Sequence, residues 1–123
     1  MKTNKLAVYG TLRNGKRDTW NVDGYLMLFP GHRNFPVAMV DDSQKELVVE
    51  IIDVNESDIH NYDVYEGVDA GLYERRIVKA YNDDEEIDAW MYTMGTLLMQ
   101  HKNVFEMVPK KDWMCEECLS LRK

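Results

Sequence analysis

The chain has 123 residues, of which 45% are hydrophobic and 30% charged, a composition typical of one globular domain spanning residues 1–123. A net charge of −7, with the basic residues scattered along the chain, argues against nucleic-acid binding. No apolar run is long enough to cross a bilayer, and the run before Gly10 is too short for a signal peptide, so we expect a cytoplasmic protein that binds no membrane.

Strands are predicted where β-branched and aromatic residues recur with a period of two. These segments run from Lys5 to Tyr9, Tyr25 to Phe29, Glu46 to Val54, Leu72 to Tyr81 and Ile87 to Met94. Turn-forming residues separate the strands, and the polar segment 82–86 is predicted to be a hairpin loop between the last two. The other turns are predicted at Pro30-Gly31 and Asp41-Asp42-Ser43.

One helix is predicted from Glu56 to Tyr65. Asn55 can cap its first turn, which carries acidic residues, and Gly67 lies just beyond its end. The segment from Lys110 to Leu119 is compatible with a second, short helix. Many short strands with an embedded helix favour an α+β, mostly β fold, built as a small closed or nearly closed β-barrel that leaves few exposed sheet edges.

A glycine turn, Gly10-Thr11-Leu12-Arg13, directly follows the first predicted strand. Glycine can adopt positive φ and lets the backbone approach a ligand closely. Successive N–H groups can then converge on a carboxylate or a phosphate. The turn is thus a candidate anion-binding site, and the alternative is an ordinary connection from a strand to a loop.

Glu66 is the candidate catalytic residue. It is spaced i, i+3, i+7 with Ile59 and Tyr62, on the helical face expected to turn toward the core. Asp63 lies on much the same face. A neighbouring carboxylate together with partial burial would raise the pKa of at least one of the two acids, as a general acid–base working near neutral pH requires.

Both glutamates of interest have a structural alternative. Glu66 could simply end the helix and form a solvated ion pair with Arg75 or Arg76. Glu50 lies on a strand face otherwise made of valine and isoleucine, so its carboxylate should be paired or protonated. It either contributes to the polar end of a pocket or anchors Arg75 or Arg76 inside the barrel, and we favour the structural role.

Other patterns have simpler structural explanations. Cys115 and Cys118 could form half of a zinc site or a redox pair, but tetrahedral zinc needs two more ligands and the three histidines show no partner spacing, so no metal is predicted. Trp90, Tyr92 and Met94 alternate along one strand face, which is typical of a core.

Several short motifs occur along the chain in a recognisable order. They are Tyr-Gly-Thr-Leu-Arg at 9–13, Asp-x-Tyr-Glu-Gly at 63–67 and Tyr-x-Arg-x-x-Val at 73–78, supported by Phe35-Pro36-Val37-Ala38 and the segment 50–54. Together they resemble the γ-glutamylcyclotransferase-like family, including its γ-glutamylamine cyclotransferase, AIG2-like branch. The resemblance covers most of the chain and implies a mixed-sheet β-barrel with short helices around it and a pocket beside the glycine turn.

The resemblance implies a reaction as well as a fold. Glu66 takes the catalytic position, as an acid/base that accepts a proton from the α-amino group of a γ-glutamyl substrate. That amine attacks the substrate's own γ-carbonyl, the ring closes as 5-oxoproline, and the same residue returns the proton to the departing amine. The implied partner is a small-molecule γ-glutamyl amide, and no cofactor, nucleotide or metal is required.

The same resemblance implies a set of binding residues. The backbone N–H groups of Gly10, Thr11 and Leu12 would hold the substrate α-carboxylate, while Tyr9 and Tyr73 would line the pocket. Three further residues are expected to contact the site residues without touching the substrate, namely Asp63, Arg75 and Glu50.

The chain departs from the family pattern at two bulkier residues. Val49 stands where the family usually has glycine, and Tyr62 stands where it usually has leucine, which leaves the substrate preference open. Two rival functions are a non-catalytic small-molecule-binding or protein-interaction module on the same barrel, and a hydrolase that uses water in place of the internal amine.

Overall fold

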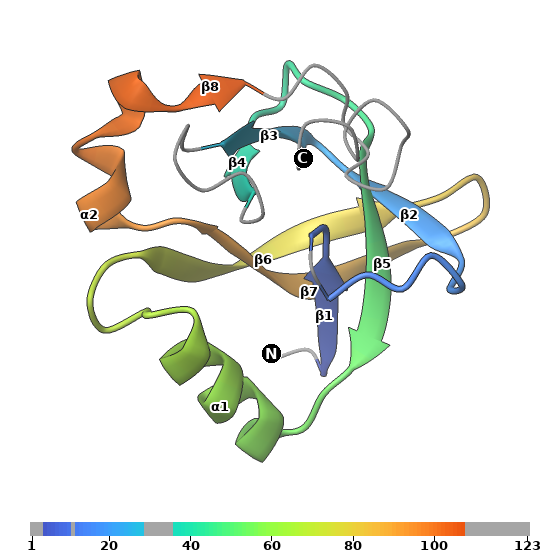
Figure 1. Cartoon of the computed structure of the whole chain (residues 1–123). Helices are drawn as coiled ribbons and strands as arrows, with labels where there is room; N and C mark the ends of the chain where they lie inside the picture. Colours follow the sequence, from blue (N-terminus) through green and yellow to red (C-terminus); the bar gives the residue numbers. More distant parts are fainter. Residues whose placement is uncertain (1–3, 11, 29–35, 108–123) are drawn as a thin grey trace.

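The computed structural model describes residues 4–10, 12–28 and 36–107 (Figure 1). Its strands are β1 (Lys5–Val8), β2 (Thr19–Val22), β3 (Gly24–Leu28), β4 (Val37–Val40), β5 (Leu47–Asp53), β6 (Tyr73–Tyr81), β7 (Glu86–Met94) and β8 (Glu106–Met107). Its helical segments are α1 (Glu56–Tyr65), α2 (Thr96–Met99) and the 3₁₀ turn η1 (Lys102–Val104). The predicted α+β, mostly β fold is confirmed.

Five of the strands close into a mixed barrel. β1 pairs with β5, β5 with β2, β2 with β6 and β6 with β7, all antiparallel. β7 then returns to β1 in parallel, where Leu6 faces Trp90, and this pairing completes the ring. β4 also joins β7 in parallel, and β3 and β8 continue from β4 as an antiparallel extension of the sheet.

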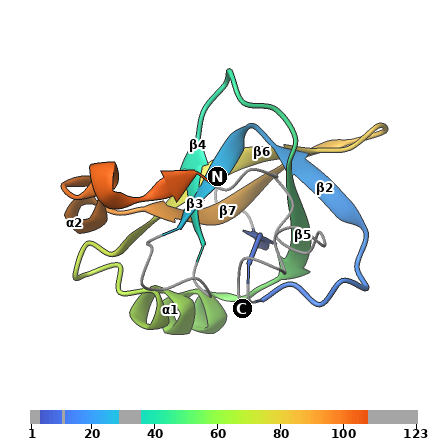
Figure 2. The same ribbon diagram turned by 45° about the horizontal axis from the view of Figure 1, so that its top comes forward.

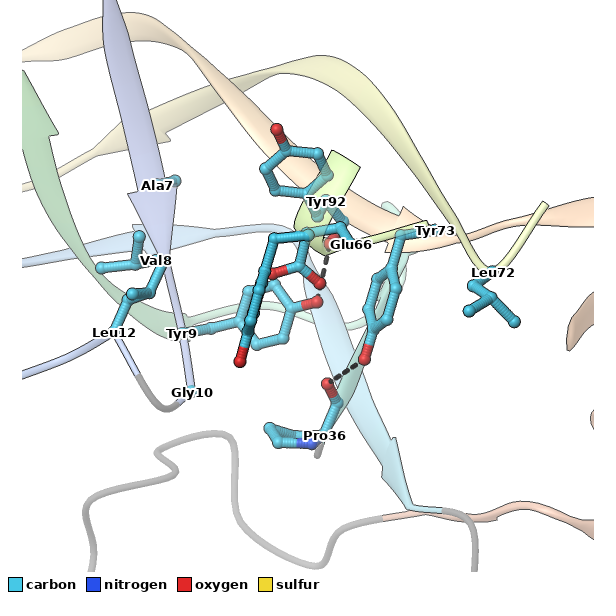
Figure 3. Close-up of a pocket in the computed structure, with 11 residues that line it drawn as sticks. Ala7, Val8, Tyr9, Gly10, Leu12, Pro36, Glu66, Leu72, Tyr73 and Tyr92 are labelled. Carbon is cyan, nitrogen blue, oxygen red and sulfur yellow. Dashed lines mark hydrogen bonds between the residues drawn. The ribbon is translucent and has the colours of Figure 1, made fainter. Parts of the chain in front are cut away.

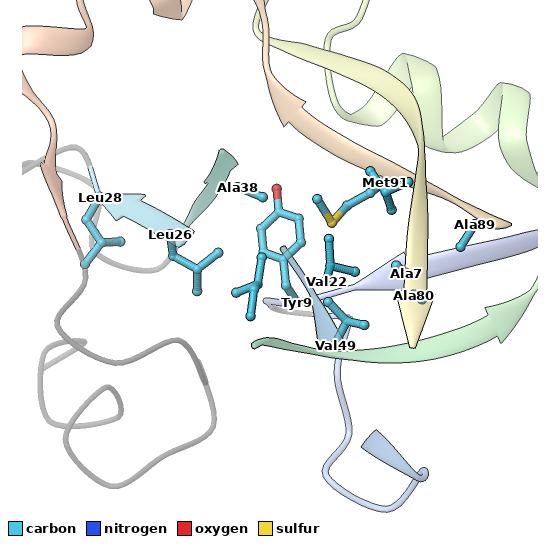
Figure 4. Packing of buried hydrophobic residues seen from close by; sticks show 12 residues of the cluster. Ala7, Tyr9, Val22, Leu26, Leu28, Ala38, Val49, Ala80, Ala89 and Met91 are labelled. Carbon is cyan, nitrogen blue, oxygen red and sulfur yellow. The ribbon is translucent and has the colours of Figure 1, made fainter. Parts of the chain in front are cut away.

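The core lies on both sides of the barrel wall because side chains alternate along each strand. In β1, Ala7 belongs with the following Tyr9 to the cluster that fills the barrel (Figure 4). Leu6 and Val8 belong to a second cluster, which packs against partly buried residues of α1. The helix therefore covers the outside of the barrel next to β1 and β7, while α2 and β8 lie on the side of β3 and β4 (Figure 2).

Helix α1 begins and ends where the sequence predicts, and local contacts explain both ends. The Asn55 side chain accepts a hydrogen bond from the Asp58 N–H at 2.8 Å, and the Asp58 carboxylate accepts one from the Asn55 N–H at 3.1 Å, which forms a capping box. At the other end, the Glu66 N–H donates to the Tyr62 carbonyl at 2.8 Å, and Gly67 follows with a φ of 65°. Glu66 is thereby held at the C-terminal end of the helix.

The five strands predicted from the sequence all form, and residues 82–85 connect β6 and β7 as the expected hairpin loop. The sequence does not predict β2 or β4. β4 is apolar throughout and shows no alternation, and β2 becomes a strand by pairing with β5 on one edge and β6 on the other. The predicted helix at 110–119 and the turn at Pro30-Gly31 lie outside the described residues.

No helix within the described part of the chain is long and apolar enough to cross a membrane.

Candidate active site

A cavity of about 340 Å³ opens where the end of β1, the end of α1 and the start of β6 meet (Figure 3). Its size is within the range of small-molecule sites. The residues that line it are Ala7, Val8, Tyr9, Gly10, Leu12, Pro36, Tyr65, Glu66, Leu72, Tyr73 and Tyr92. The structure therefore brings together segments that lie far apart in the sequence, including Tyr9, Gly10, Leu12, Glu66 and Tyr73 from the predicted site.

Glu66 is the only charged residue among the described residues that line the cavity. Its carboxylate has no hydrogen-bond or ion-pair partner among residues 4–10, 12–28 and 36–107. Burial raises the pKa of the Glu66 carboxyl from 4.5 to about 7. Both protonation states are then populated near neutral pH, which is the property that a general acid–base needs.

Asp63 does not act on Glu66 as the sequence predicts. The Asp63 carboxylate accepts hydrogen bonds from Arg75 Nε at 2.9 Å and Nη2 at 3.1 Å, and a third from the Tyr92 hydroxyl at 2.7 Å. The expectation that a neighbouring carboxylate contributes to the raised pKa of Glu66 is wrong, since the charge of Asp63 is balanced by Arg75 and burial alone causes the shift. The alternative in which Glu66 pairs with Arg75 or Arg76 is also wrong.

Arg75 has the structural role expected of it. Besides its bidentate pair with Asp63, its guanidinium stacks over the Trp90 ring, 4.1 Å from the ring centroid. Since Asp63 lies in the last turn of α1 and Trp90 lies in β7, this cluster ties the end of the helix to the barrel. Glu66 lies one turn after Asp63, so the cluster also fixes the position of Glu66.

Two tyrosines form the walls of the cavity on either side of Glu66 (Figure 3). The Tyr9 hydroxyl donates to the Tyr92 carbonyl at 2.7 Å, and the Tyr73 hydroxyl donates to the Pro36 carbonyl at 3.2 Å. Burial, followed by the neighbouring Tyr73, raises the pKa of Tyr9, and burial followed by the charge of Glu66 raises the pKa of Tyr73. Both phenols are therefore protonated near neutral pH, and their protons are directed to backbone carbonyls.

The glycine turn differs from expectation in its backbone. Gly10 is not among the positive-φ glycines of the described chain, so the turn does not use the left-handed conformation that glycine permits. Glycine is required here by close approach, because a Cβ at position 10 would lie 2.9 Å from Cγ of Pro36. The turn is closed by the Arg13 N–H, which donates to the Gly10 carbonyl at 3.0 Å. Thr11 lies outside the described residues.

Glu50 supports this turn and does not line the cavity. It is completely buried and accepts hydrogen bonds from Arg13 Nε at 2.7 Å and Arg17 Nη1 at 3.0 Å. The backbone N–H groups of Asn14 and Gly15 donate to the same carboxylate, each at 3.1 Å. The structural role predicted for Glu50 agrees with this arrangement, but the predicted partners, Arg75 and Arg76, are wrong. Glu50 instead anchors the loop that follows the glycine turn.

Sequence reasoning missed several residues of the cavity wall. Tyr92, predicted to belong to the core, is 5% exposed and lines the cavity as well. Tyr65 and Leu72 were not predicted, although each directly precedes a predicted site residue, Glu66 and Tyr73. That adjacency is the signal in the sequence that identifies them. Cys115 and Cys118 lie outside the described residues.

Comparison with known proteins gives a family match over most of the chain. A family model described as gamma-glutamyl cyclotransferase, AIG2-like, matches residues 6–115. A search of curated protein sequences gave no match.

Solved structures share the fold at low sequence identity. The crystal structure of YkqA from Bacillus subtilis has a TM-score of 0.69 and 21% identity over 98% of this chain, which spans only 43% of the length of YkqA. A solution structure of an Arabidopsis thaliana protein has a TM-score of 0.57 and 17% identity, covering 74% of this chain and 68% of its own. A protein named gamma-glutamyl cyclotransferase has a TM-score of 0.57 and 15% identity, covering 96% of both chains.

Proposed function

We propose, since the chain belongs to the gamma-glutamyl cyclotransferase, AIG2-like family, that it cleaves a γ-glutamyl amide to 5-oxoproline and a free amine. The observation that carries the proposal is the carboxylate of Glu66. It is half-buried in a tyrosine-lined cavity, has no partner among the described residues, and has a pKa of about 7. A glutamate in a structural ion pair would have a charged partner and a lowered pKa.

In the proposed reaction, ionised Glu66 accepts a proton from the α-ammonium group of the substrate. The freed amine nitrogen forms a bond to the substrate's γ-carbonyl carbon and closes a five-membered ring. The ring nitrogen then loses a second proton and the bond from that carbon to the leaving nitrogen breaks. The leaving nitrogen takes up both protons through Glu66 and departs as an ammonium ion, which leaves 5-oxoproline with a single N–H. Atoms and charges balance without water, metal or an external cofactor, and Glu66 returns to its starting state.

Orientation supplies much of the rate in such a ring closure, because the nucleophile and the electrophile belong to one molecule. The walls formed by Tyr9 and Tyr73 restrict the glutamyl chain to conformations in which its two ends meet. The turn that begins at Gly10 lies at the same cavity, and we assign to its backbone N–H groups, including those of Thr11 and Leu12, the binding of the substrate α-carboxylate. Because these N–H groups hold the α-carboxylate in one place, they also fix which face of the γ-carbonyl the amine attacks.

The test compares a γ-glutamyl amide with its N-acetyl derivative and identifies both products by mass spectrometry. We expect 5-oxoproline from the free amine and no reaction of the acetylated compound, because its nitrogen cannot attack. Release of glutamate as an open chain, or equal cleavage of the acetylated compound, would show a hydrolase. Binding of both compounds without turnover would show a non-catalytic binding module.

A further inference from the structure

The connection between β1 and β2 crosses β5 at one residue, Glu50. Val8, which ends β1, is the partner of Glu50 on one edge of β5, and Thr19, which begins β2, is its partner on the other edge. The loop between these two strands therefore passes over Glu50 (Figure 1). Gly10, which lines the cavity, lies in the first part of this loop. Any group that fixes the loop above Glu50 thus also acts on one wall of the cavity.

The Glu50 carboxylate binds the loop through both of its oxygens. Oε2 accepts hydrogen bonds from Arg13 Nε at 2.7 Å and from the Gly15 N–H at 3.1 Å. Oε1 accepts hydrogen bonds from the Asn14 N–H at 3.1 Å and from Arg17 Nη1 at 3.0 Å. Three of these donors come from consecutive residues, while Arg17 reaches the carboxylate from the part of the loop next to β2.

Arg17 also reaches back to the glycine turn. The same nitrogen, Nη1, donates to the Leu12 carbonyl at 3.4 Å. This carbonyl shares a peptide unit with the Arg13 N–H, which donates to the Gly10 carbonyl at 3.0 Å. Because a peptide unit is planar, hydrogen bonds at both of its ends fix its rotation. Arg17 therefore holds the backbone of the turn in one orientation, and Leu12 is one of the residues that line the cavity.

Orientation matters for a binding site made of backbone N–H groups. Such groups bind an anion tightly when they already point toward it, since a loop that must be ordered on binding loses conformational entropy. Arg17 itself is not among the described residues that line the cavity, and its side chain is 36% exposed. Its influence on a bound carboxylate is therefore exerted through the turn.

We propose that Arg17 is a positioning residue for the substrate α-carboxylate. It bridges Glu50 and the Leu12 carbonyl, and it thereby presets the N–H groups of the glycine turn before the substrate binds. The inference rests on the proposed function, in which this turn binds the α-carboxylate. Since the α-carboxylate takes no part in ring closure, its binding is equally strong in the ground state and in the transition state. Loss of Arg17 should therefore raise KM and leave kcat nearly unchanged.

The experiment compares γ-glutamylmethylamide with N-methyl-4-aminobutanamide, which is the same molecule without the α-carboxylate and can close to 2-pyrrolidinone in the same way. The values of kcat and KM are measured for both amides with the unaltered protein and with Arg17→Ala. Calorimetric titration in a Glu66→Gln background, where turnover is slow, gives Kd for both amides. We expect Arg17→Ala to raise KM and Kd of γ-glutamylmethylamide by about tenfold, as expected for the loss of roughly one hydrogen bond, with kcat within about threefold. The constants of the carboxylate-free amide should change by less than about threefold.

Two further variants keep the test specific. Lys16→Ala removes the same formal charge one position away, from an exposed side chain, and should bind both amides as the unaltered protein does. Arg17→Met keeps much of the length of the side chain and removes all of its donors, and it takes the place of Arg17→Ala if that variant does not fold. Thermal unfolding of each variant shows whether a change in KM accompanies a general loss of stability. Arg17→Ala should keep most of its stability, because Glu50 retains its three other donors.

The possible outcomes separate this inference from the proposed function. If Arg17→Ala leaves KM unchanged, weakens both amides equally, or is matched by Lys16→Ala, the inference is wrong, while continued release of 5-oxoproline supports the proposed function. If the unaltered protein binds γ-glutamylmethylamide and forms no 5-oxoproline from it, that result counts against the proposed function, and the Kd values alone decide the inference. Failure of the unaltered protein to bind or to convert γ-glutamylmethylamide would contradict both.

Discussion

Glu50 and Glu66 occupy two regions of one small barrel and have opposite surroundings. Glu50 is completely buried, yet two arginines and two backbone N–H groups donate to it. Burial raises the pKa of Glu50, but the hydrogen bonds from Arg13, Asn14 and Gly15 outweigh that effect and lower it. Glu66 is less buried and has no such donors among the described residues, so burial raises its pKa to about 7.

The comparison shows that the donors around a carboxylate, more than its depth, decide what it can do. A carboxylate with four donors stays ionised and holds a loop in place. A carboxylate without donors exchanges its proton near neutral pH and can serve a reaction. The same residue type therefore gives the barrel an anchor on one side and a proton acceptor on the other.

The largest expected effect is on activity at Glu66. Glu66→Gln keeps the shape of the side chain and removes the proton acceptor, so turnover should fall by roughly 10²–10⁴-fold, the usual contribution of general acid–base catalysis. In the unaltered protein, kcat/KM should rise with pH through about 7, because Glu66 must be ionised to accept the proton. Assays of 5-oxoproline release across pH 5–9 measure both.

Glu85→Gln, in the exposed hairpin loop between β6 and β7, is the control for this variant and should retain full activity. If Glu66→Gln retains most of the turnover, the two glutamates do not differ in the way proposed.

The next largest effect is on stability at Glu50. Glu50→Ala leaves the buried Arg13 without its carboxylate and should lower the free energy of unfolding by about 3–5 kcal/mol, as measured by urea denaturation. Because the folded-state pKa of Glu50 is lowered, its stabilising contribution is present above the unfolded value of about 4.5 and is lost as pH falls through the folded value.

The difference in unfolding free energy between Glu50→Gln and the unaltered protein should therefore be larger at pH 7 than at pH 3. A difference that does not change with pH would mean that Glu50 is not held ionised by its donors.

The smallest effect has the opposite sign and concerns stability at Glu66. A carboxyl group with a raised folded-state pKa loses stabilisation as pH rises from 4.5 to about 7. Glu66→Gln should therefore be more stable than the unaltered protein at pH 8, by about 1–2 kcal/mol after allowance for partial exposure to solvent. The gain should disappear at pH 4. Thermal unfolding of both proteins at the two pH values tests this, and a gain that is equal at both would contradict the raised pKa.

Features set by neighbouring residues in the chain could be predicted, and features set by distant partners could not. The ends of α1 follow from Asn55 and Gly67, each within two residues of the helix, and both ends were predicted correctly. The partner of Glu50 is Arg13, 37 positions away, and the sequence pattern alone pointed to Arg75 or Arg76 instead. The pattern places Glu66 on an inward face. Its lack of partners could not be predicted, because it depends on Arg75 pairing with Asp63 and not with Glu66.

The pairing of Leu6 with Trp90 has a consequence for how the chain is made. These residues are 84 positions apart in the sequence, and their pairing closes the ring. Contacts of such long sequence separation form late and slow the folding of a small domain. A nascent chain emerging from the ribosome cannot complete the barrel until β7 has been synthesised. Until then, apolar side chains of β1 and β5 remain exposed. Tyr9 directly follows β1, Tyr92 lies in β7, and both line the cavity around Glu66, so the cavity is assembled only when β7 closes the barrel.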